Sequence, residues 1–315
     1  MSGRILRLWV DGGTDRGRAC RDRGFSRGGR GFFRVSPLAR QESPLLRLWR
    51  VVYPVLVHFT ISQLVSGTAL YWYMNHAKDP TEAFSRQVIF LTGLGNLLAM
   101  IPALSFFKKD QKRYGNRYLS RQIGGFEKKG DRFRLTMQDF VLLLLIGSGL
   151  ALYCNVLLGW LQMLGLLPGV DPLGAYMEGY SFPMLILILG IFSPITEEMV
   201  FRWLLYYRLR DYLGKMPAVL LSALVFGIYH LNILQGVYAF ILGTAFALFQ
   251  EWSGNLWTSV LLHIGANCFS LLISEFGTVF FGMDNEYLVL LVYFVLMFAI
   301  VGGTNVFRRR SRSIE

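Results

Sequence analysis

Charged side chains are scarce in this sequence. Of its 315 residues only 17% are Asp, Glu, Lys or Arg, whereas 53% are hydrophobic. A soluble globular protein carries about 25% charged residues. This deficit argues against a soluble protein of ordinary domains and favours a protein that is embedded in a membrane.

The sequence is also poor in cysteine and has no apolar leader. Cys20, Cys154 and Cys268 are too scattered for a metal motif or a disulfide framework. The last two lie in apolar runs, where a free cysteine packs as a small core residue. Residues 1–45 contain no continuous apolar stretch of about 7–15 residues, so we expect no secretory signal peptide.

Long apolar runs do follow, from residue 51 onward, and short polar connections separate them. A membrane-spanning helix needs about 20 predominantly apolar residues. The sequence therefore predicts an all-α fold, a polytopic membrane bundle of about eight transmembrane helices, in which the fifth and sixth are the shortest. The predicted spans are 51–73, 87–107, 138–162, 182–206, 217–233, 236–252, 256–275 and 287–306.

The distribution of basic residues predicts the orientation of this bundle. Lys and Arg precede the first span, fill the loop 108–134, follow the fourth span as Arg208 and Arg210, and end the chain. The loops 165–181 and 276–286 contain neither Lys nor Arg. Since cytoplasmic loops carry the excess of positive charge, we expect both termini in the cytoplasm and a multi-pass protein of the plasma membrane.

The composition divides the chain into segments. The formal net charge of +12 is concentrated in basic blocks, which suit anionic lipid headgroups better than nucleic acid, and we expect no nucleic-acid partner. The predicted segments are a basic, Arg/Gly-rich disordered cytoplasmic extension (1–46), two membrane helices with a basic loop (47–134), a membrane core (135–306) and a basic cytoplasmic tail (307–315).

The fourth predicted span contains charged residues where hydrocarbon is expected. Each charge in a membrane helix costs about 2.5–3.5 kcal/mol on insertion scales, which makes it a candidate for a functional role. Glu198 and Arg202 are four residues apart and share one helix face, so they can neutralise each other. Glu197 is rotated by about 100° and has no partner on its own helix. A carboxylate so placed suits a general base or a proton carrier.

Two further pairs of residues lie one helical turn apart on later spans. Phe226 and His230 occur in FGIYH, and His263 and Asn267 in HIGAN. An imidazole and an amide on one face offer two donors to an oxyanion or a bound water. Each of the polar residues, taken singly, is also compatible with a hydrogen bond between two helices. Phe226 is compatible with a packing role. The other histidines, His58 and His76, fit structural roles.

Together these residues resemble the three-motif signature of the CPBP family. This family comprises the type II CAAX prenyl endopeptidases and bacterial proteins linked to bacteriocin processing and self-immunity (the Abi group). The resemblance covers roughly residues 135–275. The motifs are Glu197-Glu198-x-x-x-Arg202, Phe226-x-x-x-His230 and His263-x-x-x-Asn267.

The resemblance implies a hydrolase, an intramembrane endopeptidase that acts on a membrane-associated peptide or protein. Glu197 and His230 would hold and deprotonate a water molecule. His263 and Asn267 would stabilise the tetrahedral oxyanion. Glu198 and Arg202 would brace the helix and tune Glu197. We expect the substrate from the cytoplasmic side or from lipid.

The cofactor requirement has two interpretations. A set of Glu197, His230 and His263 could bind zinc with a water in the fourth position. HExxH is absent, and an Asn paired with His263 suits an oxyanion hole, so we prefer a mechanism without metal or other cofactor.

Two other functions are compatible with the spans. One is a non-enzymatic bacteriocin-immunity or scaffold protein that retains the protease fold, but such a protein tends to lose a catalytic group. The other is a proton-coupled transporter, which predicts related halves. No internal repeat is visible in the sequence.

Overall fold

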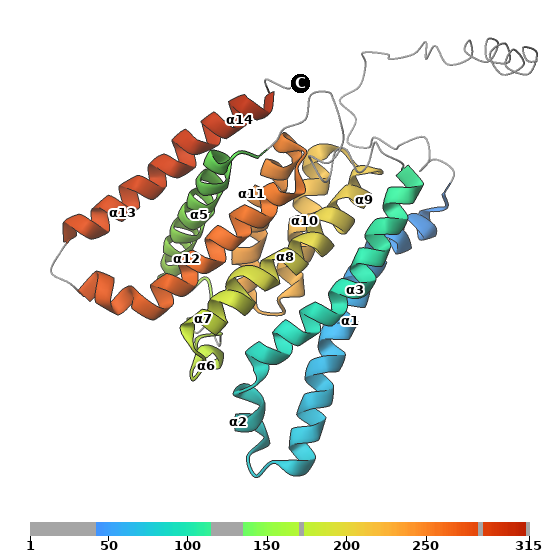
Figure 1. Ribbon diagram of the computed structural model, residues 1–315, viewed down its shortest axis with the longest axis horizontal. Coiled ribbons are helices and arrows are strands. Elements are labelled where there is room, and N and C mark those ends of the chain that lie inside the picture. The colour runs from blue at the N-terminus through green and yellow to red at the C-terminus, as the bar shows by residue number, and fades with distance from the viewer. Residues whose placement is uncertain (1–41, 115–134, 170–172, 283–285, 313–315) are drawn as a thin grey trace, which may run out of the picture. The chain divides into compact units, whose positions relative to one another are not determined.

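The computed structural model describes residues 42–114, 135–169, 173–282 and 286–312, which form helices without a strand (Figure 1). The order of elements is α1 (Pro44–His76), α2 (Pro80–Ser85), α3 (Val88–Tyr114), α5 (Met137–Met163), α6 (Leu173–Met177), α7 (Phe182–Leu185), η2 (Ile186–Phe192), α8 (Ser193–Glu198), η3 (Met199–Tyr206), α9 (Tyr207–Arg210), α10 (Lys215–Tyr229), α11 (Ile233–Ser253), α12 (Leu256–Gly282), α13 (Glu286–Phe298), η4 (Ala299–Gly303) and α14 (Thr304–Arg312).

Seven helices within the described residues are long and apolar enough to cross a membrane. They confirm the predicted all-α polytopic bundle. The fifth predicted span, 217–233, corresponds to α10, which has only 15 residues. At about 1.5 Å per residue it is shorter than the ~30 Å hydrocarbon core of a bilayer. The chain leaves α10 early because Leu231 adopts a left-handed backbone (φ 53°) and Asn232 caps α11.

Local capping signals set several helix boundaries. Ser43 accepts a hydrogen bond from the N–H of Leu46, and proline follows at the first helical position, so α1 begins at Pro44. Residues 44–46, predicted to be part of a disordered extension, are therefore helical. The rest of that extension up to residue 41, and residues 115–134 of the basic loop, lie outside the described residues. Thr136 and Asp139 form a capping box at the start of α5.

The fourth span is one helix of 29 residues, Phe182–Arg210, with two wide segments. The segments η2 and η3 are π-helical and flank α8, which carries both glutamates. Such turns, in which hydrogen bonds reach five residues back, are frequent at functional sites. This composite helix contacts α3 on one side and α12 on the other (Figure 1).

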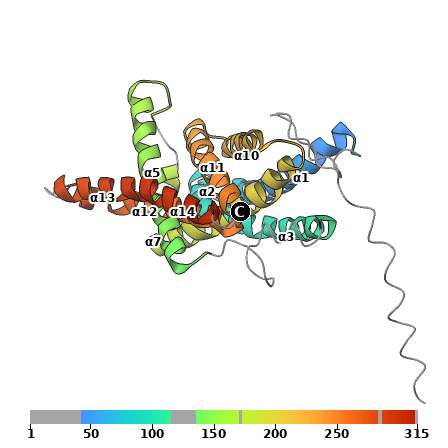
Figure 2. The ribbon, with the colours of Figure 1, turned by 90° about the horizontal axis from the view of Figure 1, so that it is seen from above.

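Glycines allow α5 and α12 to pack closely. A Cβ at Gly147 would overlap the carbonyl of Leu262, and a Cβ at Gly265 would overlap the carbonyl of Leu144. Small residues at such crossings let membrane helices approach backbone to backbone. The contact holds α12, with His263 and Asn267, in place beside the composite helix. Seen from above, α13 and α5 lie together on the side away from α3 (Figure 2).

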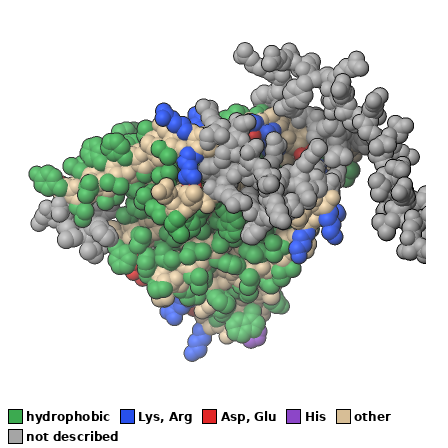
Figure 3. Space-filling view, turned by 45° about the horizontal axis from the view of Figure 1, so that its top comes forward, with side chains coloured by type: hydrophobic (Ala, Val, Ile, Leu, Met, Phe, Trp, Pro, Cys, Tyr) green, Lys and Arg blue, Asp and Glu red, His purple; other side chains and the backbone are tan. Residues whose placement is uncertain are grey.

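Large apolar side chains cover much of the outer surface. Figure 3 shows hydrophobic side chains over most of the described part of one face, with Lys and Arg toward its margins. Trp72, Leu187, Ile228 and Phe298 are each more than half exposed. In an integral, multi-pass membrane protein this surface faces lipid.

Candidate active site

The two neighbouring glutamates on α8 have different surroundings. The side chain of Glu198 is 0% exposed and that of Glu197 is 15% exposed. Glu198 Oε1 lies 3.0 Å from Nη1 of Arg202, whose side chain is also fully buried. The pairing predicted from the i, i+4 spacing is confirmed.

Aromatic rings enclose the charge of Arg202. Its guanidinium lies 4.4 Å from the centroid of the Phe226 ring and 5.7 Å from that of Phe246. A Cβ at Gly243 would lie 2.6 Å from Nη2 of Arg202, so a larger residue there would displace the guanidinium. Phe226 thus packs on the cation, and the ion pair is fully buried, where its attraction is strong.

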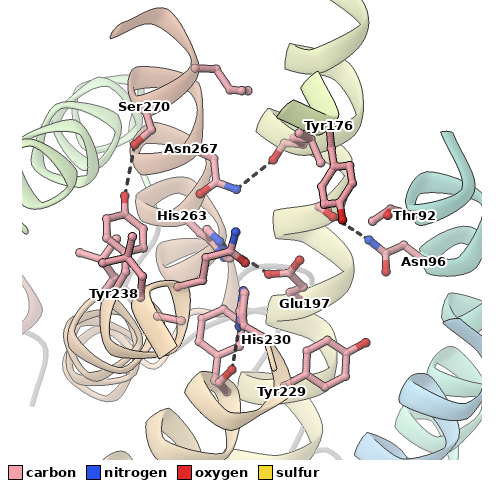
Figure 4. A pocket seen from close by; sticks show the side chains of 18 of the residues that line it. Thr92, Asn96, Tyr176, Glu197, Tyr229, His230, Tyr238, His263, Asn267 and Ser270 are labelled. Carbon is pink, nitrogen blue, oxygen red and sulfur yellow. Dashed lines mark hydrogen bonds and ion pairs between the residues drawn. The ribbon is translucent and has the colours of Figure 1, made fainter. Parts of the chain in front are cut away.

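His263 connects the two glutamates. Its Nδ1 lies 2.9 Å from Oε1 of Glu198, and its Nε2 lies 3.7 Å from Oε2 of Glu197 (Figure 4). A carboxylate only accepts hydrogen bonds, so Nδ1–H donates to Glu198 and Nε2 faces Glu197. The sequence had grouped His263 with Asn267 and, in the zinc interpretation, with Glu197 and His230, but not with Glu198. In the structure it is also the link between the braced glutamate and the accessible one.

Asn267 hydrogen-bonds the backbone of the composite helix. Its Nδ2 donates to the carbonyl of Leu189 over 2.9 Å. The N–H of Ser193 bonds the carbonyl of Ile188, and Pro194, next in the chain, has no N–H to offer. The amide of Asn267 therefore satisfies a carbonyl that the proline leaves without this donor. Only its second N–H and its oxygen are available to a ligand.

His230 occupies the C-cap of α10 rather than the interior of a span. Its Nδ1 lies 2.9 Å from the carbonyl of Phe226, so Nδ1–H donates and Nε2 is left as an acceptor. The short turn after it, with Leu231 at positive φ, fixes the ring at this place. Figure 4 shows His230 beside Glu197 in the same cavity.

A cavity of about 720 Å³ brings the predicted residues together. Glu197, His230, His263 and Asn267 all line it, and so does Phe226. Its lining also includes polar residues that the sequence interpretation did not select: Ser62, Gln63, Ser66, Thr92, Asn96, Asn155, Gln162, Tyr176, Ser193, Tyr229, Gln235, Tyr238 and Ser270. Isolated amides and hydroxyls inside apolar spans were the signal that could have found them.

His58 supports the wall of this cavity. Its Nδ1 lies 2.7 Å from the hydroxyl of Tyr229, which joins α1 to α10. This contact agrees with the structural role expected for His58.

The described residues include no set of ligands for the zinc ion of the alternative interpretation. Among the described residues no three or more His, Cys, Asp or Glu side chains are grouped so that they could hold a metal ion. Glu197, His230 and His263 share the cavity without forming such a group.

Fold and site together define a class: an integral, multi-pass membrane protein with a buried Glu–Arg–His cluster that opens to an internal cavity. Residues 179–269 match the family model described as "Type II CAAX prenyl endopeptidase Rce1-like". This region contains all three motifs, and the match confirms the resemblance to the CPBP family.

One curated relative comes from Bacillus subtilis (strain 168) and carries the name "Putative membrane peptidase YdiL". It is 26% identical over 93 residues, which make up 30% of this chain and 38% of the relative. The chain thus aligns with well under half of that protein. No solved structure matches the chain.

Proposed function

We propose that the protein is an intramembrane endopeptidase in which Glu197 activates water for attack on a peptide bond. The observation that supports this most is the unequal state of the two glutamates. Glu198 is held by Arg202 and His263, whereas Glu197 is partly exposed on the cavity. One carboxylate is therefore available to take a proton.

In the proposed reaction a water molecule lies between Glu197 and the substrate carbonyl. Glu197 accepts a proton from the water while the oxygen of the water bonds to the carbonyl carbon. The tetrahedral intermediate then collapses, the C–N bond breaks, and the proton on Glu197 passes to the leaving nitrogen. The products are a new carboxyl terminus and a new amino terminus.

The two histidines have different tasks in this proposal. His230, with Nδ1–H bound to the carbonyl of Phe226, presents an acceptor nitrogen that orients the water. His263 is aligned by Glu198, and its Nε2 edge faces the part of the cavity where the oxyanion develops. The free N–H of Asn267 donates to the same oxygen.

The substrate we propose is a membrane-associated peptide or protein, because the catalytic residues lie inside a bundle whose outer surface is apolar. We place the protein in the plasma membrane, with anionic lipids at its basic loops.

The test is a cleavage assay in proteoliposomes with a library of membrane-anchored peptides. Replacing Glu197 with Gln keeps the shape and removes the base, so we expect kcat to fall by about 10²–10⁴-fold. Glu275→Gln is the matched control, since Glu275 is exposed on α12 and does not line the cavity. Equal activity of Glu197→Gln and wild type would refute the proposed base. Absence of cleavage by wild type on every peptide would favour the non-enzymatic alternative.

A further inference from the structure

Among the described residues, those that line the cavity extend from Glu197 toward one end of the bundle. On α1 its lining residues, Ser62 to Ser66, lie in the half that leads to α2, and on α3 they are confined to Val88–Asn96 at its start. On α5 they are Asn155 to Gln162, in its last third. These are the helix ends joined through α2 and α6. We call this end of the bundle the α2 end.

Buried ion pairs close the opposite end, which we call the α9 end. Arg208 is fully buried, and its Nε lies 2.7 Å from Oδ2 of Asp110 on α3. Its Nη1 donates to the carbonyl of Arg50 on α1 over 2.6 Å. Arg208 was expected at the cytoplasmic surface, but it lies inside this network. A buried pair that loses one partner costs about 3–5 kcal/mol, so this end of the bundle does not open easily.

A second set of contacts also closes the α9 end, just outside the membrane spans. Nη2 of Arg50 lies 2.9 Å from Oδ2 of Asp211, and the hydroxyl of Tyr212 donates to Glu42 over 2.6 Å. Burial and the hydrogen bond to Glu42 raise the pKa of Tyr212 to about 12. Tyr212 therefore stays neutral and continues to donate across the physiological range.

The cavity walls are polar but almost uncharged. Among the described residues that line it, Glu197 is the only carboxylate and there is no Lys or Arg. The side chains of Gln63, Ser66 and Asn155 make no hydrogen bond to any described residue. Gln63 and Asn155 are exposed, so their amide groups are available to a ligand that enters the cavity.

We infer that a substrate segment reaches Glu197 from the α2 end, and that Gln63, Ser66 and Asn155 bind the backbone of an extended, uncharged stretch of peptide. This inference rests on the proposed function. Amides donate and accept hydrogen bonds, as the free N–H and C=O groups of an extended chain require. A helical segment has already satisfied those groups within itself.

The described lining residues include no Lys or Arg, and this affects which part of a peptide chain can bind near Glu197. A peptide that ends near the cleaved bond, as a C-a-a-X tail does, brings a terminal carboxylate. Such a carboxylate meets the carboxylate of Glu197 and no Lys or Arg among the described lining residues, so an internal segment fits better. With the orientation predicted from the basic loops, the α2 end faces away from the cytoplasm. The inferred route thus differs from the cytoplasmic approach, which was one of the two that the sequence suggested beside an approach from lipid.

Cysteine labelling tests the route without requiring activity. In a variant with Cys20, Cys154 and Cys268 replaced by Ala, we would introduce Gln63→Cys or, at the α9 end, Lys108→Cys, which is exposed. A membrane-impermeant maleimide is then added to sealed vesicles of each orientation. We expect Gln63→Cys to react from the side opposite to the side that labels Lys108→Cys. Labelling of both from the same side, or no labelling of Gln63→Cys, would overturn the inferred access.

Two measurements test whether Gln63 and Asn155 bind an extended peptide. An uncharged extended peptide should slow the labelling of Gln63→Cys, whether or not it is cleaved. Gln63→Leu and Asn155→Leu should each raise KM about 2- to 12-fold with kcat little changed, the effect of one lost hydrogen bond. Gln87→Leu, exposed and outside the lining, should keep the wild-type KM.

An unchanged labelling rate in the presence of the peptide, or an unchanged KM in both cavity variants, would overturn the inferred binding of the peptide backbone. If wild type cleaves no peptide, the proposed function fails, while access and peptide protection are still decided by labelling.

Discussion

At the scale of single residues, the site depends on the difference between two adjacent carboxylates. Successive residues on a helix point about 100° apart, so Glu198 faces Arg202 and His263 while Glu197 faces the cavity. The buried charge of Glu198 is matched on two sides. The accessible charge of Glu197 has Nε2 of His263 nearby and room for a water molecule.

Removing the partner of Glu198 should destabilise the fold. Arg202→Leu leaves a fully buried carboxylate without its arginine partner and with only His263 beside it, so we expect a loss of about 3–5 kcal/mol, measured as thermal unfolding in detergent. Arg309→Leu, at an exposed position of α14, should change stability by less than about 0.5 kcal/mol. Equal unfolding temperatures for the two variants would contradict a buried ion pair.

Sequence spacing predicted the contacts that are local and missed those that are not. The Glu198–Arg202 pair lies within one turn of one helix, so its spacing was sufficient. The His263–Glu198 contact joins residues 65 positions apart, and the Asn267–Leu189 bond joins two different helices. Neither distance follows from a helical period, because both depend on how α12 packs on the composite helix.

At the scale of elements, the composite helix needs outside help at Pro194. Pro194 donates no N–H, and Asn267 on α12 supplies one to the carbonyl of Leu189. Asn267 therefore connects two helices, in addition to the role proposed for it in catalysis. A proline inside a helix leaves a carbonyl without its helical donor, but the sequence alone does not identify the residue that supplies another.

This coupling can be measured in a double-mutant cycle. Asn267→Ala should cost about 1–3 kcal/mol of stability, since a buried carbonyl loses its donor. In the Pro194→Ala background a new N–H becomes available in the same turn, so the same substitution should cost less. Thermal unfolding in detergent gives all four values. Strictly additive effects would argue against the shared carbonyl.

The helices themselves were predictable because lipid requires long apolar runs. Each of the eight predicted runs corresponds to a helical segment. The fifth was predicted too long, since its apolar sequence continues past the turn at Leu231. Hydropathy does not register a left-handed residue, and so it cannot place His230 at a helix end.

At the scale of the whole molecule, charge distinguishes the two ends of the bundle. The α9 end carries buried ion pairs that join α1, α3 and α9, whereas the cavity approaches the α2 end through neutral polar groups. The predicted cytoplasmic position of the termini places the α9 end inside the cell.

Reporter fusions test this orientation. Green fluorescent protein fused after Glu315 should fluoresce, because the C-terminus is predicted to be cytoplasmic, and alkaline phosphatase fused at the same place should be inactive. A fusion of each reporter into the 77–87 connection should give the opposite pair of results. Active phosphatase after Glu315 would reverse the assigned orientation.

The central claim is that Glu197 is the base and that Glu198 and Arg202 brace it. It is tested most directly by comparing kcat of Glu197→Gln with that of the double variant Glu198→Gln/Arg202→Met, each checked for folding by its unfolding temperature. The double variant removes both buried charges together and keeps an acceptor for His263. We predict that Glu197→Gln loses about 10²–10⁴-fold in kcat while folding like wild type, and that the double variant retains more activity. Cleavage by Glu197→Gln that equals or exceeds that of the double variant would contradict the account.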